Sequence, residues 1–306
     1  MDKLSTESIY NLGFDLWNSF MELAIMLFTT SPTSANSSVY STVHNIYLSI
    51  RSCSVPIAIC FFLIAVIKDN VEKDSGVIPR RLMQDVMKYL IFVAILANLW
   101  EIMGMIVAFT DGLTDRISAS NSVLFTANED LNSLFEEVNG LENTVDHSWA
   151  WTDMSGSIER IGAWILEFIS IGFCKTMFFI TGIAFLFSII ASGFSIISTA
   201  YQRILKPLII LPFSAIMVAF AAGSTEQERT TMQYLKTFFG FCLSGAFMVV
   251  AINIGTAFAN GGLIAFDLTD KDLAYRMFSV CIEMSATPLV IAGLVKGIDS
   301  IIGRIL

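Results

Sequence analysis

Apolar residues gather along the chain in long runs separated by polar segments. The strongest runs are 53–67, 89–109, 161–199, 234–258 and 277–295. Extended back to Ile50, even the shortest run approaches the roughly 20 residues that an α-helix needs to cross a bilayer. The pattern predicts an all-α, polytopic membrane protein with about five transmembrane helices, and with other helices outside the membrane.

The run 161–199 is too long for one upright span. Its thirty-nine residues would extend about 58 Å as a helix, almost twice the hydrocarbon thickness of a bilayer. Gly172, followed by Lys175, is the natural point of division. We therefore expect an oblique or interfacial segment over 161–173 and a spanning helix over 176–198.

The stretch 198–223 reads STAYQRILKPLIILPFSAIMVAFAAG and is the most unusual part of the chain. We expect a basic turn holding Arg203 and Lys206, followed by an apolar part bounded by Pro207 and Pro212. Each proline lacks a backbone donor and disfavours helix in the preceding residue. The fifteen residues 208–222 are too few for a span of about 20. They form either a short helix with a bent start, or a re-entrant or broken half-helix shielded by protein or water.

Two segments outside the strong runs have the pattern of amphipathic helices. In residues 9–28, the polar residues Asp15, Asn18 and Glu22 would lie on the helix face opposite the apolar residues. This pattern favours a helix lying in the membrane interface. A sixth spanning helix is the alternative there. Residues 129–141 carry apolar residues at helical spacing and predict a small amphipathic helix.

Composition supports a membrane protein and excludes several classes of function. The 306 residues are 55% hydrophobic and 15% charged, with a mean hydropathy of +0.68. A net charge of −9 argues against nucleic-acid binding over the whole surface. The five cysteines lie in or beside apolar runs without a CxxC pair, so we interpret them as core residues. No HExxH, GxSxG or phosphate-binding glycine loop occurs. We therefore expect no enzymatic activity, no metal and no cofactor.

Basic residues predict the orientation, because short loops rich in Lys and Arg stay cytoplasmic. Placing the loop 68–88 inside puts 110–160 outside and returns the Arg203 turn to the inside. If 208–222 re-enters, the remaining basic residues near the C-terminus also fall inside. The result is a multi-pass protein with its N-terminus outside and its C-terminus inside.

This orientation divides the chain into four consecutive segments. They are an external N-terminal segment (1–50), a two-helix hairpin with a cytoplasmic basic loop (51–109), an acidic external loop (110–160) and a C-terminal transmembrane bundle (161–306).

Several residues inside the apolar runs are candidates for function or packing. An ionisable group at membrane depth usually faces protein or water, or else snorkels to the interface. The candidates for channel or hinge residues are Arg203, Lys206, Pro207, Pro212, Glu101, Glu167, Lys175 and Glu283. Small residues let helices approach closely, and a mid-helix amide can bridge helices. The packing candidates are Gly240, Ser244, Ala251, Asn253, Gly255 and Ala259.

The layout and one local motif resemble a known family. An exported N-terminal segment, few spans, a large external loop and the sequence YQRILKPLIILP (201–212) are similar to the TrbL/VirB-type polytopic inner-membrane channel subunit of type IV secretion and conjugation systems. The external loop is modest and strongly acidic here, and we expect no long C-terminal cytoplasmic extension.

The resemblance implies a non-enzymatic, oligomeric platform in the bacterial cytoplasmic (inner) membrane. Such a subunit works with a secretion ATPase and a coupling protein, and it meets the translocated DNA or protein only transiently. A secondary transporter or small channel is the main alternative, although transporters usually carry two corresponding interrupted segments and only one is found here. A non-conducting membrane scaffold is the third possibility.

Overall fold

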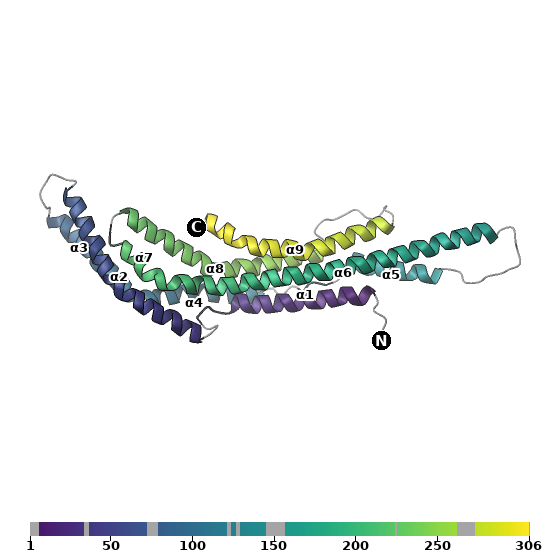
Figure 1. Cartoon of the computed structure of the whole chain (residues 1–306), viewed down its shortest axis with the longest axis horizontal. Helices are drawn as coiled ribbons and strands as arrows, with labels where there is room; N and C mark the ends of the chain where they lie inside the picture. The colour runs from purple at the N-terminus through teal and green to yellow at the C-terminus, as the bar shows by residue number, and fades with distance from the viewer. Residues whose placement is uncertain are drawn as a thin grey trace. The chain divides into compact units, whose positions relative to one another are not determined.

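A computed structural model describes residues 6–33, 37–71, 79–120, 124–126, 129–144, 157–223, 225–261 and 273–305. These residues form helices and no strand, which confirms the all-α prediction (Figure 1). The elements are α1 (Thr6–Thr29), α2 (Ser37–Val71), α3 (Pro79–Ala97), α4 (Leu99–Ser120), α5 (Glu129–Thr144), α6 (Ser157–Ile210), η1 (Leu211–Phe213), α7 (Ser214–Phe220), α8 (Thr225–Gly261) and α9 (Leu273–Ile305).

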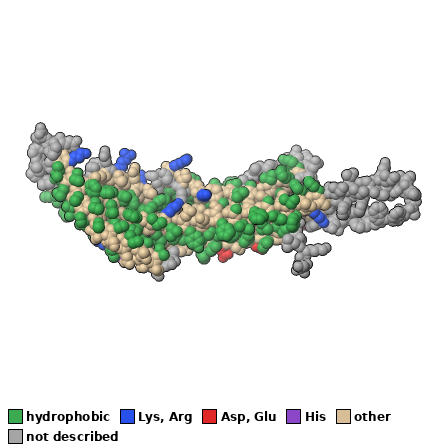
Figure 2. Space-filling view, in the orientation of Figure 1, with side chains coloured by type: hydrophobic (Ala, Val, Ile, Leu, Met, Phe, Trp, Pro, Cys, Tyr) green, Lys and Arg blue, Asp and Glu red, His purple; other side chains and the backbone are tan. Residues whose placement is uncertain are grey.

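The chain is a polytopic membrane protein. Among the described residues, four helical stretches are long and apolar enough to span a membrane: Ser38–Lys68, Gly172–Phe220, Gln227–Asn260 and Tyr275–Ile298. The pair Val86–Ala97 and Leu99–Ala119 adds a fifth if it counts as one span. Hydrophobic side chains cover much of the visible face of the described residues (Figure 2).

The predicted division near Gly172 is wrong. Helix α6 is continuous from Ser157 to Ile210 and passes through Gly172 without a break. A glycine inside a helix costs only about 1 kcal/mol relative to alanine. The strongly apolar flanks outweigh that cost, so the length of the run did not require a division of the helix.

A sharp bend occurs instead within the expected span 89–109. Helices α3 and α4 meet at 63° on either side of Asn98. The Asn98 side-chain amide donates to the Ala94 carbonyl at 3.1 Å, and its backbone N–H lies 3.2 Å from the Ile95 carbonyl. A polar side chain that binds the preceding turn competes with the regular helical ladder, and here it accompanies the bend.

The chain folds into two compact units, each built from separated stretches of sequence. Unit 1 comprises Met1–Leu23, Ser122–Ile197 and Ala251–Lys296, and unit 2 comprises Ala24–Asn121, Ser198–Val250 and Gly297–Leu306. The four consecutive segments inferred from charge do not coincide with either unit.

Aromatic side chains from α1, α5 and α6 form the core of unit 1. The Tyr10 ring lies 5.5 Å from both Phe135 and Phe185, centroid to centroid. Helix α5 is the amphipathic helix that the sequence predicted, and its Leu131 and Leu134 are buried. The apolar spacing thus orients α5 with its hydrophobic face inward.

A short non-helical segment of unit 1, residues 124–126, is bound by two asparagine side chains. Asn18 of α1 donates to the Phe125 carbonyl and accepts from the Phe125 N–H, both at 3.0 Å. Asn260 of α8 makes the corresponding bonds to the Leu124 carbonyl at 2.7 Å and the Thr126 N–H at 3.2 Å. These amides satisfy backbone groups that no helix or sheet would pair.

The core of unit 2 joins α2, α3, α4, α6, α7 and α8. Its buried residues include Tyr47, Met103, Leu208, Ala215 and Phe238. The same core includes Leu211 of η1, and α7 packs against α2 and α3. Much of the proline-bounded stretch is therefore enclosed by other helices of this unit.

The stretch 198–223 differs from the prediction in where it bends. Arg203 and Lys206 lie inside α6, so the expected basic turn is wrong. Pro207 also lies inside α6, whereas Pro212 lies in η1. A helix tolerates one missing hydrogen bond when packing supports it. Only Pro212 coincides with an interruption, and the seven-residue α7 follows it.

Helix α8 runs back beside the end of α6 and α7. The Tyr234 hydroxyl donates to the Ile210 carbonyl at 2.9 Å, and the Thr231 hydroxyl donates to the Met217 carbonyl at 2.5 Å. The chain therefore reverses between Phe220 and Thr225, after the proline-bounded stretch rather than within it.

Candidate functional site

The candidate site is a buried ion pair inside unit 2. Asp111 of α4 accepts a hydrogen bond from Arg203 of α6, with 3.0 Å between Oδ1 and Nη2. Arg203 is 2% exposed and Asp111 is 7% exposed. The sequence prediction assigned these residues to opposite sides of the membrane, Arg203 to an inner turn and Asp111 to the outer loop. The structure instead places both residues inside helices and in direct contact.

The same guanidinium binds backbone carbonyls at the C-terminal end of helix α1. Arg203 Nη1 donates to the carbonyl of Phe28 and, at 3.3 Å, to that of Thr30. The last carbonyls of a helix have no intrahelical donor and carry the negative end of the helix dipole. The planar guanidinium fork can bind several acceptors at once. Arg203 thus neutralises a carboxylate and satisfies the C-terminus of α1.

A glycine of α8 makes room for this guanidinium. A Cβ atom at Gly245 would lie 2.5 Å from Arg203 Cζ and 2.7 Å from Nη2. Arg203 Nε has no hydrogen-bond partner among the described residues. On this side the guanidinium therefore packs against the α8 backbone at Gly245 and makes no further hydrogen bond among the described residues. Sequence reasoning did not identify Gly245, because the four-residue and seven-residue spacings that defined the small-residue stripe do not include it.

The pair lies within candidate membrane spans, where its chemistry is that of a fixed charge contact. Asp111 belongs to the stretch Leu99–Ala119 and Arg203 to Gly172–Phe220. Ionisable groups at such positions are costly unless they are paired. No cluster of His, Cys, Asp or Glu able to hold a metal occurs in the part of the chain that the structure describes. The arrangement can hold helices in place or respond to a change in charge.

The other predicted channel residues are distributed over several helices and both units. Glu101 is exposed in the first turn of α4, while Lys206 Nζ lies 5.6 Å from the Phe241 ring centroid. Lys175 and Glu283 are half-buried and belong to unit 1. The side chain of Glu167 lies outside the described residues. Pro207 and Pro212 are buried within α6 and η1.

The predicted packing residues of α8 are mostly buried. Gly240, Ser244, Asn253, Gly255 and Ala259 are buried, and Ala251 is half-buried. In unit 1, a Cβ at Gly255 would lie 2.7 Å from Cγ1 of Ile291 in α9. A small residue there lets α8 and α9 approach closely, as small-residue positions do in membrane helices.

Comparison of the chain with protein-family models, curated proteins and solved structures finds no match.

Proposed function

We propose that this protein is an oligomeric, non-enzymatic channel or platform subunit of a type IV secretion or conjugative transfer machine. It resides in the bacterial cytoplasmic (inner) membrane with its N-terminus outside and its C-terminus inside. There it works with a secretion ATPase and a coupling protein and contacts the translocated DNA or protein transiently.

One observation supports this proposal most directly. One face of the stretch 201–212, on which the family resemblance rests, lies in the interior of unit 2, whereas Tyr201, Leu205 and Ile209 are exposed. Within it Arg203 forms the buried ion pair, and Leu208 and Leu211 join the core. A motif placed at the junction of several spanning helices is expected of a part that positions or moves those helices.

The exposed face of α2 fits a subunit that assembles within a membrane. Only 11% of the residues in the apolar window of α2 are buried within the chain. Val55, Ile59, Leu63 and Ile67 are each at least 39% exposed. Exposed apolar surface of this kind requires lipid or neighbouring subunits to cover it.

The proposal can be tested by cross-linking in donor cells. A tagged copy of the chain would replace the native one in cells carrying its conjugative element. Formaldehyde cross-linking and immunoprecipitation should then enrich the transferred DNA strand over chromosomal DNA. The enrichment should disappear when the secretion ATPase is inactivated. Normal transfer in cells that lack the chain would contradict the proposal.

A secondary transporter or small ion channel is the second candidate, because of the Asp111–Arg203 pair. Intramembrane acid–base pairs occur in proton relays of transporters. Purified protein in liposomes with a pH-sensitive dye would measure proton flux under an imposed potential. Flux that is present in the wild type and lost in Asp111→Asn would favour the transporter. If the protein shows no proton flux and no DNA cross-linking, the remaining alternative is a non-conducting scaffold.

A further inference from the structure

The exposed surface of α1 in unit 1 divides into a polar and an apolar part. Five exposed polar or acidic side chains, termed the polar stripe, follow one another at helical spacing: Glu7, Asn11, Asp15, Ser19 and Glu22. Residues three or four apart lie on one face of a helix, so the stripe runs along one side of α1. The neighbouring exposed residues Leu12 and Leu23 are apolar. The remaining side packs on the core through Tyr10 and Phe14.

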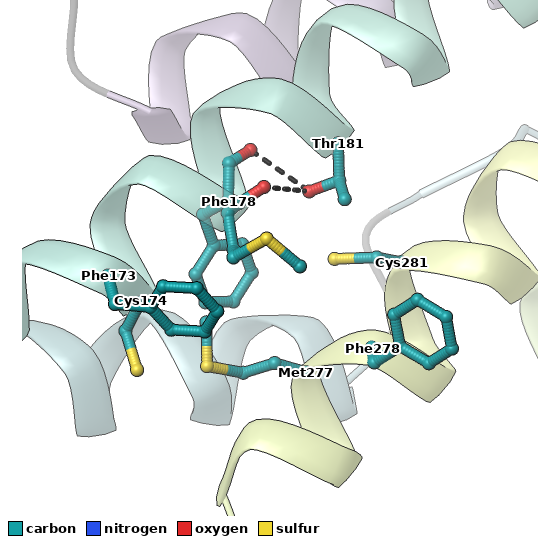
Figure 3. Close-up of a pocket in the computed structure, with 8 residues that line it drawn as sticks. Phe173, Cys174, Phe178, Thr181, Met277, Phe278 and Cys281 are labelled. Carbon is teal, nitrogen blue, oxygen red and sulfur yellow. Dashed lines mark hydrogen bonds between the residues drawn. The ribbon is translucent and has the colours of Figure 1, made fainter. Parts of the chain in front are cut away.

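Contacts within unit 1 place the polar stripe at the depth of a candidate membrane span. That span, Tyr275–Ile298 of α9, is 24 residues long, about 36 Å as a helix, which suits a hydrocarbon core of about 30 Å. The Tyr10 hydroxyl oxygen lies 3.5 Å from Cys281 Sγ of α9 and 2.9 Å from Thr181 Oγ1 of α6. Figure 3 shows Thr181 and Cys281 beside one pocket that α6 and α9 line together. Tyr10 therefore lies level with Cys281.

The three helices run in the same direction, so depth increases along α1 after Tyr10. Between α1 and α6, the ring-centroid contacts advance along both helices, from Phe14 with Phe185 at 5.3 Å to Phe20 with Phe194 at 5.9 Å. Between α6 and α9, the Ser188 hydroxyl donates to the Ser285 carbonyl at 2.5 Å, beyond Thr181 and Cys281 on both helices.

The rise of a helix then gives the depth of the two central acids. Cys281 is six residues from the start of the span at Tyr275, which corresponds to about 9 Å. Asp15 is five residues beyond Tyr10, or about 7.5 Å further. Asp15 thus lies about 16–17 Å inside the span, close to its middle, and Glu22 lies about 27 Å inside it.

Lipid and a second copy of the chain are both poor neighbours for these acids. An ionisable group at membrane depth is costly unless it faces water or protein. At the same levels α6 exposes Phe187 and Phe194, at 69% and 63%, as a lipid-facing surface does. Neither Asp15 nor Glu22 takes part in an ion pair among the described residues. A symmetric contact between two copies would set acids against acids. Water is the neighbour that suits both acids.

We propose that the polar stripe borders a water-filled passage at membrane depth, and that its acidic side chains favour hydrated cations over anions. Rings of Asp or Glu give cation selectivity in channels in this way. Asn11 and Ser19 supply neutral hydrogen-bonding groups between the acids. Leu12 and Leu23 face lipid. The inference rests on the proposed channel function, because it names part of the channel lining.

The test is cysteine labelling of the full chain in native membrane fragments, which expose both sides of the bilayer to the reagent. The background carries Cys53→Ser and Cys60→Ser, because both of these thiols are exposed. The three remaining cysteines are buried, and labelling of this background alone is subtracted from every measurement.

Four single cysteines compare the polar stripe with the apolar residues beside it. Asn11→Cys and Glu22→Cys lie on the stripe, and Leu12→Cys and Leu23→Cys are controls one residue further along, at nearly the same depth. A cationic methanethiosulfonate should react about tenfold faster at the two stripe positions, because hydrocarbon excludes charged reagents.

A second measurement tests the preference for cations. At Asn11→Cys the cationic reagent should react faster than an anionic methanethiosulfonate, after each rate is divided by that reagent's rate with a free thiol in solution. Adding Asp15→Asn, one helical turn away, should lower this ratio about twofold or more, because an acid concentrates cations beside it. An unchanged ratio would overturn the cation preference.

The labelling pattern also separates the alternatives. Equal labelling at all four positions would show that this part of unit 1 lies outside the membrane, and it would overturn the proposal. Absence of labelling on the stripe in membranes would overturn it as well, and labelling that appears only in detergent would identify another protein as the neighbour. The DNA cross-linking test of the secretion role does not involve these cysteines, so the two proposals can fail separately.

Discussion

Single residues explain why Arg203 tolerates deep burial. Its guanidinium meets the Asp111 carboxylate and two carbonyls at the end of α1, so its charge and most of its donors are satisfied. A buried ion pair adds little net stability compared with a well-packed apolar pair. Removing one partner is different, because the other charge then stays buried without compensation.

Asp111→Asn and Arg203→Met should therefore each lower the free energy of unfolding by about 3–5 kcal/mol. The double variant should lose less than the sum of the two. Denaturant titration of the purified protein measures all three, and Asp115→Asn, one turn away and exposed, is the matched control with an expected change near zero. Additive losses in the double variant would show that the two side chains are not energetically coupled.

Gly245→Ala should also destabilise the protein, by about 1–3 kcal/mol, because its Cβ would overlap the Arg203 guanidinium. Gly104→Ala is the matched control, since a Cβ there meets no heavy atom within 4 Å. That control should be neutral or slightly stabilising, as alanine is the better helix former. Equal thermal stability of the two variants would mean that Arg203 can move away without loss.

The sequence singled out Arg203 but not its partner. Asp111 opens a segment crowded with acids, and its pairing depends on Arg203 of α6, which lies 92 residues further along the chain. The amides of Asn18 and Asn260 were not identified as a clamp for the same reason, because their partners are backbone groups more than 100 residues away. Local patterns predict which residues are costly to bury, and tertiary structure decides what compensates them.

At the scale of elements, periodicity predicted the amphipathic helices well because it is a local property. Helix α5 begins at Glu129, as the spacing of its apolar residues indicated. Breaks were harder to predict. Gly172 and Pro207 leave α6 intact, while Asn98 accompanies a 63° bend that its sequence neighbours do not suggest. Whether a weak helix former interrupts a helix depends on packing around it, which one sequence does not reveal.

The two prolines of the central stretch should therefore differ when each is replaced by alanine. Pro212→Ala restores a donor for the Leu208 carbonyl, and it should convert η1 into regular α-helix joining α6 to α7. Amide hydrogen exchange over 211–220 should then slow. Pro207→Ala adds a donor within a helix that already exists and should change exchange there much less. A larger effect from Pro207 would contradict this account of the break.

At the scale of the whole molecule, stretches of the two units alternate along the sequence. Helices α6 and α8 each contribute to both, and each unit gathers three separated stretches. Charge counting along the chain treats consecutive segments as independent, and it therefore separated Arg203 from Asp111. The number of candidate spans was predictable from composition, whereas the pairing of distant stretches was not.

If the two units open independently, a core substitution in either one should affect only that unit. Phe125 is 1% exposed in unit 1, with its ring centroid 5.0 Å from that of Phe14. Phe125→Ala should cost about 3–5 kcal/mol there. We expect faster amide exchange in α5 and in residues 6–23 of α1, because exchange reports local opening free energies.

Asp111→Asn should produce the complementary pattern, with faster exchange in α2 and α4, both of unit 2, and unchanged exchange in α5. The two variants serve as controls for each other, since both remove a buried contact of similar expected energy. Exchange measured by mass spectrometry in lipid nanodiscs resolves these peptides. If either variant accelerated exchange to the same extent in both units, the chain would open as one cooperative body, and the long helices α6 and α8 would be the elements that couple it.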